Sequence, residues 1–184
     1  KLDLRLPESQ RILLREIEKT GKPLIIVNAS GSAINTEDNA DALIQAWYSG
    51  AMGGKALADI LLGKVSPSGK LPVTFYGNAD LLPEFTDYSM KNRTYRFAEN
   101  NILYPFGYGL SYTTFDVQAA LDMCSLPAGL AKGEVSKTDT LNVTYDITNT
   151  GDVAGKETIQ FYVQKPQGFL GKPSRELIRF AKTE

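Results

Sequence analysis

The stretch AWYSGAMGGKALADILLGKVSPSGKLPVTF, from Ala46 to Phe75, decides the fold of this chain. Within it, the residues from 51 to 62 place apolar side chains at the 3.6-residue spacing of a helix packed on a sheet. Gly63 is placed to end that helix, and the SPSG cluster at 66–69 predicts a turn before a short extended segment. The stretch therefore predicts one helix–strand unit of an α/β domain.

The residues before this stretch extend the same alternation of helix and strand. An apolar stripe behind Pro7 predicts a helix near 7–20, with Gly21 as its stop. PLIIVNASGS (23–32) and DALIQAWY (41–48) read as two buried strands that end in small or polar residues. We expect a layered α/β sandwich with a mainly parallel sheet.

A different pattern begins after Phe115. From Leu141 to Thr148 apolar and polar residues alternate, and NTGD then predicts a turn. The alternation repeats from Glu157 to Gln164, and Pro166 ends it. Two half-buried antiparallel strands of this kind suggest a β-sandwich.

Charge and hydropathy exclude several classes of partner. Lys plus Arg number 20 against 21 Asp plus Glu, so the net charge of −1 gives no electrostatic footprint for nucleic acid or for an anionic membrane. The run from Pro23 to Val27 is too short to span a bilayer, and the start KLDLRLPE lacks the apolar core of a signal peptide. We expect a soluble chain that binds neither nucleic acid nor membrane.

The chain contains no histidine and a single cysteine, Cys124. A Ser/His/Asp triad, a histidine-containing zinc site and a histidine general base are therefore excluded within it. The turn SGAMGGKA also fails as a nucleotide-binding loop, because Ser49 and Ala56 stand where that loop needs Gly and Ser or Thr. We expect neither a metal nor a cofactor.

Two sequence blocks, Ala46–Phe75 and LYPFGYGLSYTTF (Leu103–Phe115), together resemble the C-terminal half of glycoside hydrolase family 3 in order, spacing and residue type. That family contains β-glucosidases and β-xylosidases. Farther on, ITNTGDVAGKETIQFYV and SRELIRF resemble its fibronectin type III-like domain. The resemblance implies part of the family's C-terminal α/β domain over 1–98, a linker over 99–115 and an incomplete fibronectin type III-like domain over 116–184.

The function implied by the resemblance is that of a retaining exo-β-glycosidase, acting on terminal non-reducing glucose or xylose. Such an enzyme needs two carboxyl groups about 5–5.5 Å apart. The resemblance places the nucleophile Asp on a missing barrel domain, on the same chain or a partner, and the acid/base Glu before Lys1. We therefore expect no catalytic residue here and an isolated chain without activity. The loop acids are expected to be solvated surface rather than stand-ins: Glu37, Glu84, Asp87 and Glu99. The alternative is a non-catalytic carbohydrate-binding or scaffolding module.

Four substrate-proximal candidates follow from the predicted sheet, because ligands of open α/β sheets bind beyond the carboxyl ends of the strands. Asn28 and Ser30 are placed to hydrogen-bond sugar hydroxyls, and Trp47 and Tyr48 to stack on a pyranose face. The competing interpretation is that Trp47 closes the core and that NASGS is only a small-residue turn.

Three further candidates, Arg93, Tyr95 and Arg96, come from DYSMKNRTYRF (Asp87–Phe97), which is similar to the family's dYsMkgRTYRyf. Arginine forks and tyrosine rings can border a sugar pocket or lock two domains together. Packing between domains is the favoured interpretation. The aromatic residues of PFGYGLSYTTF are likewise expected to pack at a domain junction.

Overall fold

The computed structural model describes residues 3–36, 40–121, 136, 138–140, 142–165 and 171–184. Cys124, Glu37 and Leu141 lie outside the described residues. Twelve elements follow one another along the described part of the chain: α1 (Glu8–Glu18), β1 (Ile25–Asn28), β2 (Ala42–Gln45), α2 (Gly53–Leu61), β3 (Phe75–Tyr76), the 3₁₀ turn η1 (Ala79–Leu81), α3 (Thr94–Phe97), β4 (Ile102–Tyr104), β5 (Phe115–Leu121), β6 (Val143–Asn149), β7 (Thr158–Val163) and β8 (Glu176–Lys182).

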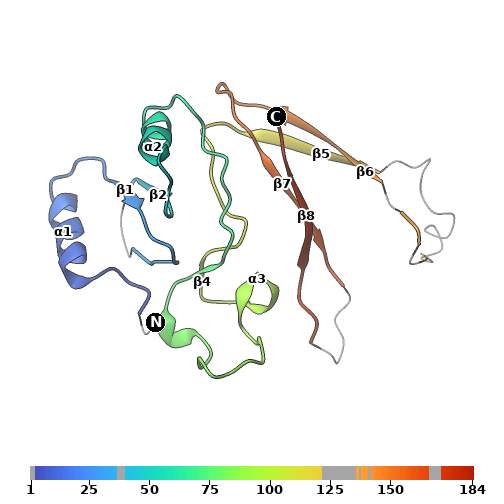
Figure 1. The fold of residues 1–184 in the computed structure, drawn as a ribbon, viewed down its shortest axis with the longest axis horizontal. Coiled ribbons are helices and arrows are strands. Elements are labelled where there is room, and N and C mark those ends of the chain that lie inside the picture. The colour runs from blue at the N-terminus through green and yellow to red at the C-terminus, as the bar shows by residue number, and fades with distance from the viewer. Residues whose placement is uncertain (1–2, 37–39, 122–135, 137, 141, 166–170) are drawn as a thin grey trace.

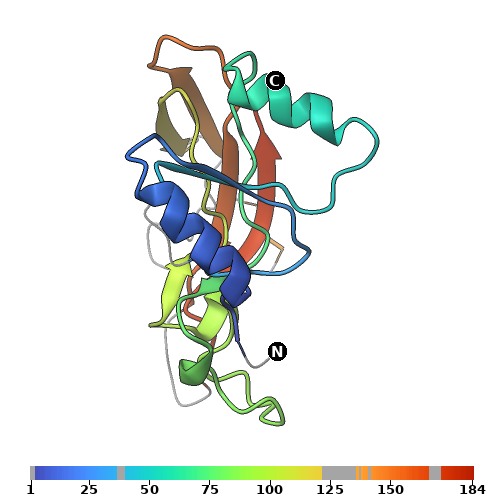
Figure 2. The same ribbon diagram turned by 90° about the vertical axis from the view of Figure 1, so that its left-hand side faces the viewer.

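The N-terminal part has the predicted alternation of helix and strand. β1 and β2 pair in parallel, from Ile25 opposite Ala42 to Asn28 opposite Gln45. The layers follow one another across Figure 1, with α1 outermost, then β1 and β2, then β4, and the long strands β5 to β8 on the far side. Figure 2 shows the same order in depth, with α1 in front and β7 and β8 behind. The described residues thus contain one parallel pair, and a wider parallel sheet stays a prediction.

A proline precedes α1, and a glycine with positive φ follows each of the two N-terminal helices. Pro7 lies just before α1, and its carbonyl accepts hydrogen bonds from the Gln10 and Arg11 N–H groups of the first turn. Proline is tolerated at a helix start because an N–H there has no partner within the helix. Gly21 has φ +65° after α1 and Gly63 has φ +69° after α2, a conformation that glycine adopts without steric cost. The helices predicted over 7–20 and 51–62 are therefore present, each slightly shorter than predicted.

The core lies where the middle segment meets the second strand. Phe75, at the start of β3, is 3% exposed and is the buried apolar side chain of the described residues. Trp47 and Tyr104 each pack edge-on against its ring at 6.2 Å between centroids. β3 pairs with β4 in antiparallel fashion, so the predicted linker over 99–115 includes a strand. These aromatic contacts join residues far apart in sequence into one cluster.

The C-terminal part consists of two antiparallel ladders. β5 pairs with β6 and β7 pairs with β8, with an irregularity in register between Phe161 and Tyr162. The ladders contact each other through Tyr145 and Phe161, whose rings are 5.0 Å apart at 79°. The strands predicted over 141–148 and 157–164 correspond to β6 and β7, whereas β5 and β8 were not predicted. A complete fibronectin type III-like sandwich stays a prediction.

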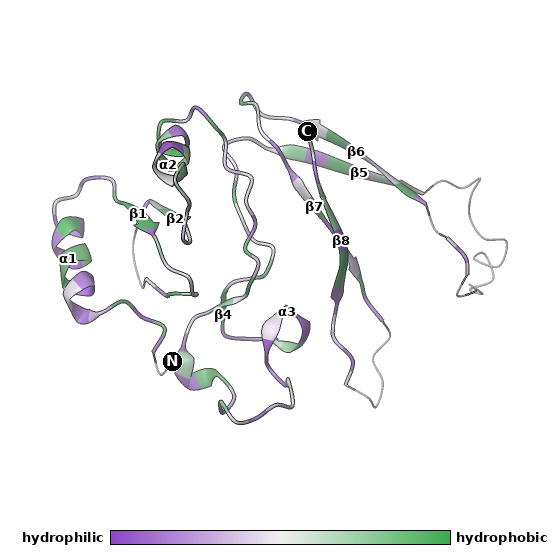
Figure 3. Cartoon of the chain, viewed as in Figure 1, coloured by the Kyte–Doolittle hydropathy of each residue, from purple (hydrophilic) through white to green (hydrophobic). Residues whose placement is uncertain are grey.

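Apolar side chains remain exposed on the N-terminal elements. Ile12 and Leu13 on α1 and Ile25 on β1 are each at least half exposed. Figure 3 shows the corresponding hydrophobic segments on α1 and β1. None of the helices in the described ranges has the length and apolar character needed to cross a membrane.

Candidate functional site

The carboxyl ends of β1 and β2 form a hydrogen-bonded edge. Asn28 is buried, and its Nδ2 donates to Gln45 Oε1 at 2.7 Å across the strand pair. Gln45 Nε2 in turn donates to the Ser30 carbonyl at 3.0 Å, and Ser30 Oγ donates to the Ser32 carbonyl at 3.1 Å. Each of these two amide nitrogens therefore donates one hydrogen bond within the edge. Gln45 connects the two sides of this edge through both of these hydrogen bonds. The sequence did not single out Gln45, although a polar side chain at the end of an apolar strand is a signal for such a role.

Trp47 and Tyr48, which follow this edge, have different environments. Trp47 has φ +55° and packs against Phe75, as the core interpretation of this residue expected. Tyr48 is 82% exposed and lies against the NASGS turn, where a Cβ on Gly31 would come within 2.6 Å of Tyr48 Cε2. Of the two aromatic candidates, Tyr48 thus presents its ring to solvent beside the sheet edge.

Arg93 holds its own loop. Its Nη2 donates to the carbonyl of Glu84 at 2.6 Å and to that of Pro83 at 3.4 Å, while its Nε is buried with no hydrogen-bond partner in the described structure. The guanidinium therefore ties the segment before α3 to the preceding loop. The acceptors of these two hydrogen bonds are backbone carbonyls.

Tyr95 and Arg96 connect α3 to β8, and we call this set of contacts the α3–β8 clamp. The Leu177 N–H donates to Tyr95 Oη at 3.0 Å, and Arg96 pairs with Glu176 at 3.6 Å. The Tyr95 ring also stacks on Phe106 at 4.3 Å. Ser174 adds a backbone N–H and its hydroxyl, both donating to the Arg96 carbonyl. These contacts are those of the packing alternative for the two residues.

Acid is expected to weaken the α3–β8 clamp through Glu176. A hydrogen bond from Lys165 at 2.7 Å, with Arg96 as a second cation, lowers the pKa of Glu176 below its ordinary value of 4.5. A lowered folded-state pKa stabilises the fold above the unfolded-state value and loses that contribution as the pH falls through the folded-state value. The thermal midpoint should therefore fall more steeply in wild type than in Glu176→Gln below about pH 4.5.

Circular dichroism melts across the acidic range measure this difference. Glu16→Gln removes an exposed α1 carboxylate that pairs with Lys19 and serves as the control. Parallel pH profiles for wild type and Glu176→Gln would contradict the proposed contribution of Glu176.

A second set of contacts, centred on Lys70, connects the middle segment to β7. Lys70 Nζ donates to the Gly109 carbonyl at 2.8 Å and lies 3.0 Å from Glu157 Oε1. Thr158 Oγ1 donates to the Ser68 carbonyl at 3.1 Å, and Gln160 Nε2 to the Gly107 carbonyl at 3.0 Å. We call these contacts the Lys70 bridge. The LYPFGYGLSYTTF segment thus lies at this junction through its backbone carbonyls, whereas its Tyr108 and Tyr112 side chains are 38% and 47% exposed.

Where a described carboxylate has a shifted pKa, the shift is downward. A hydrogen bond from the Ser89 N–H lowers the pKa of Asp87. Hydrogen bonds from Arg5 lower the pKa of Asp3 to about 2. A general acid needs the opposite shift. In the described ranges no group of three or more His, Cys, Asp or Glu side chains converges as a metal site would require.

The seven candidates therefore separate into two places. Asn28, Ser30 and Tyr48 gather at the end of the parallel pair, and Trp47 beside them packs against Phe75. Arg93, Tyr95 and Arg96 lie at α3, which Figure 1 shows beside β8 and away from β1 and β2. In the part of the chain that the structure describes, no single surface contains both sets of candidates.

Comparisons with known proteins identify the family of the chain. The model of the glycosyl hydrolase family 3 C-terminal domain matches residues 1–112. The chain is 48% identical over 174 residues to a xylan 1,4-beta-xylosidase of Xylanibacter ruminicola, covering 91% of this chain and 19% of that protein. It is 35% identical over 195 residues to a periplasmic beta-glucosidase of Salmonella typhimurium, covering 98% of this chain and 24% of that protein.

Solved structures give the same result. Beta-glucosidase 3B from Thermotoga neapolitana, in complex with glucose, superposes with a TM-score of 0.81 at 32% identity over all of this chain and 27% of that one. The chain spans between a fifth and about a quarter of the length of the curated relatives named above. By its sequence and its fold, the chain belongs to glycosyl hydrolase family 3, through the C-terminal domain of that family.

Proposed function

We propose that this chain is the non-catalytic C-terminal part of a retaining exo-β-glycosidase that removes terminal β-linked glucose or xylose. Residues 1–98 belong to the α/β domain, 99–115 link it onward, and 116–184 belong to a fibronectin type III-like domain. The nucleophile Asp and the acid/base Glu lie outside the chain, with the nucleophile on a barrel domain. Two relatives of this chain bear the names of a β-xylosidase and a β-glucosidase, which supports both sugars as candidates.

The observation that carries the proposal is the match of the family's C-terminal domain model over residues 1–112. Retaining hydrolysis needs one carboxyl that holds its proton near neutral pH and a second that attacks the sugar. Asp3, Asp87 and Glu176 are held ionised by their hydrogen bonds instead. The proposal assigns the chemistry to the rest of the enzyme because the family match is to the C-terminal domain.

The sheet edge is the surface that we assign to substrate. Tyr48 offers an exposed ring of the kind that stacks on a pyranose face, and Ser30 lies on the adjacent turn. Asn28 and Gln45 then hold this edge in shape rather than bind sugar, because their amides bond each other. Tyr95 and Arg96 serve the connection to β8.

The isolated chain is expected to hydrolyse neither nitrophenyl β-glucoside nor nitrophenyl β-xyloside. The reason is that the proposal places the paired carboxylates on which the displacement depends outside this chain. Release of nitrophenol is followed at saturating substrate concentration. Circular dichroism on the same sample establishes that the chain is folded. Turnover by a folded, contaminant-free chain would overturn the proposal and return attention to Glu84 and Glu99.

A further inference from the structure

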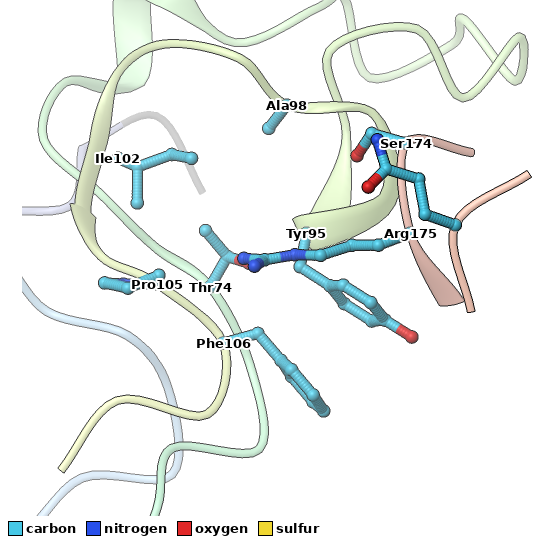
Figure 4. Close-up of a pocket in the computed structure, with 9 residues that line it drawn as sticks. Thr74, Tyr95, Ala98, Ile102, Pro105, Phe106, Ser174 and Arg175 are labelled. Carbon is cyan, nitrogen blue, oxygen red and sulfur yellow. The ribbon is translucent and has the colours of Figure 1, made fainter. Parts of the chain in front are cut away.

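A pocket of about 270 Å³ lies between α3, β4 and the chain entering β8, and the contacts described so far leave it without a function. Figure 4 shows its wall formed by Tyr95 and Phe106 on one side and by Ala98, Ile102 and Pro105 on the other, with Thr74 and Arg175 projecting between them. Gln164, at the end of β7, completes the polar part of the lining. The pocket therefore joins residues of the two halves of the chain.

Thr74 is the first sign that the pocket has a ligand. Its residue is 8% exposed, and its Oγ1 is buried with no hydrogen-bond partner among the described residues. A buried hydroxyl without a partner destabilises a fold, and native structures leave few of them. An acceptor placed in the pocket would satisfy this hydroxyl.

Arg175 supplies the charge. Its guanidinium lies over the Tyr162 ring, 5.2 Å from the centroid, and it forms no ion pair within the described structure. The adjacent carboxylate, Glu176, is already engaged by Lys165 and Arg96. A planar guanidinium that rests on a ring keeps its outer N–H groups for a bidentate acceptor.

The lining combines donors with an apolar wall and holds no carboxylate. Arg175, the Thr74 hydroxyl and the Gln164 amide can all donate, while the stacked pair of Tyr95 and Phe106 offers a flat apolar surface. The volume lies near the lower end of small-molecule sites, which restricts the ligand to about the size of one sugar ring.

We propose that this pocket binds a small carboxylate, with Arg175 as the bidentate partner and Thr74 as a further donor. The ligand is either a short organic acid or a monosaccharide acid, since both present the same planar acceptor. Because the pocket is lined from both the α3 side and the β8 side, the bound ligand stabilises the connection between them. The site is separate from the sheet edge at Tyr48 and does not depend on the proposed glycosidase activity.

Titration calorimetry of the 184-residue chain with sodium acetate, glucuronate and glucose, at ionic strength matched with chloride, tests the proposal. We expect acetate and glucuronate to bind and to raise the thermal midpoint, and glucose not to bind. Tighter binding of glucuronate would identify a sugar acid as the preferred ligand, whereas equal affinities would show that the carboxylate alone is recognised. Absence of carboxylate binding would overturn the proposal.

Variants locate the binding in this pocket. Arg175→Lys keeps the charge but loses the fork, so its affinity should fall about tenfold, which corresponds to one bidentate charge-assisted contact. Thr74→Val has the same shape without the hydroxyl and should weaken binding while its thermal midpoint without ligand stays level or rises. Arg179→Ala removes an exposed arginine of β8 that does not line the pocket, and it should bind as wild type does. Equal binding by Arg175→Lys, Thr74→Val and wild type would contradict the assignment.

Discussion

Replacing Gly109 with alanine is expected to destabilise the chain by roughly 1–3 kcal/mol, the usual cost of overpacking a tight site. A Cβ at this position would lie 2.2 Å from the Gly69 carbonyl oxygen, and this oxygen belongs to backbone that cannot rotate aside. The surrounding backbone is fixed on both sides, since the Leu71 N–H donates to the Tyr108 carbonyl and the Gly107 N–H to the Leu71 carbonyl. Urea denaturation followed by tryptophan fluorescence measures the loss.

Gly54→Ala is the matched control for this substitution. Gly54 lies in α2, and a Cβ there would meet no atom within 4 Å. Alanine is favoured over glycine inside helices by about 1 kcal/mol, so the control should be neutral or stabilising. A Gly109→Ala chain as stable as Gly54→Ala would show that the two segments do not approach as closely as described.

Replacing Lys70 with methionine is expected to cost about 2 kcal/mol, somewhat less than the loss for breaking a fully buried ion pair. The side chains of Lys70 and Glu157 are only 18% and 16% exposed, and Lys70 also donates to the Gly109 carbonyl. Removing the ammonium leaves the Glu157 carboxylate and the Gly109 carbonyl without this hydrogen-bond donor in a largely buried place. Unfolding free energies from urea titrations give the effect.

Lys55→Met provides the comparison at an exposed pair. Lys55 bonds Asp59 one turn along α2, and such surface pairs contribute roughly 0.3–0.5 kcal/mol. A double-mutant cycle of Lys70→Met with Glu157→Gln should then return a coupling free energy well above that of Lys55 with Asp59. Coupling no larger than at the helix pair would mean that the Lys70 bridge adds little to the junction.

The sequence predicted the N-terminal elements well because their signals are local. Pro7, Gly21 and Gly63 act through backbone geometry that needs no distant partner: Pro7 directly precedes α1, and Gly21 and Gly63 follow shortly after α1 and α2. β5 and β8 were missed for the opposite reason. In β8 both Ile178 and Phe180 are exposed, so apolar residues in this strand do not mark a buried face, and pairing with β7 alone defines it.

For the candidate site, the sequence indicated which residue types could bind a sugar. It did not indicate which of these residues are exposed or which distant residues they contact. Tyr48 lies exposed beside the end of the parallel pair, whereas Trp47 is half-buried and packs against Phe75. Tyr95 bonds Leu177, which lies 82 residues farther along the chain, and no periodicity of the sequence encodes such a partner. Thr74 was overlooked because an unpartnered hydroxyl becomes visible only when its whole surroundings are known.

The most direct test of the central claim is the activity of a chimera. In it, this chain replaces the matching segment of the Xylanibacter ruminicola xylosidase, to which it is 48% identical over 174 aligned residues. If the chain is the non-catalytic part of such an enzyme, kcat/KM for nitrophenyl β-xyloside should stay within about tenfold of the parent, a change of about 1.4 kcal/mol in the barrier. A chimera that folds like its parent but hydrolyses neither the xyloside nor the glucoside would contradict the account.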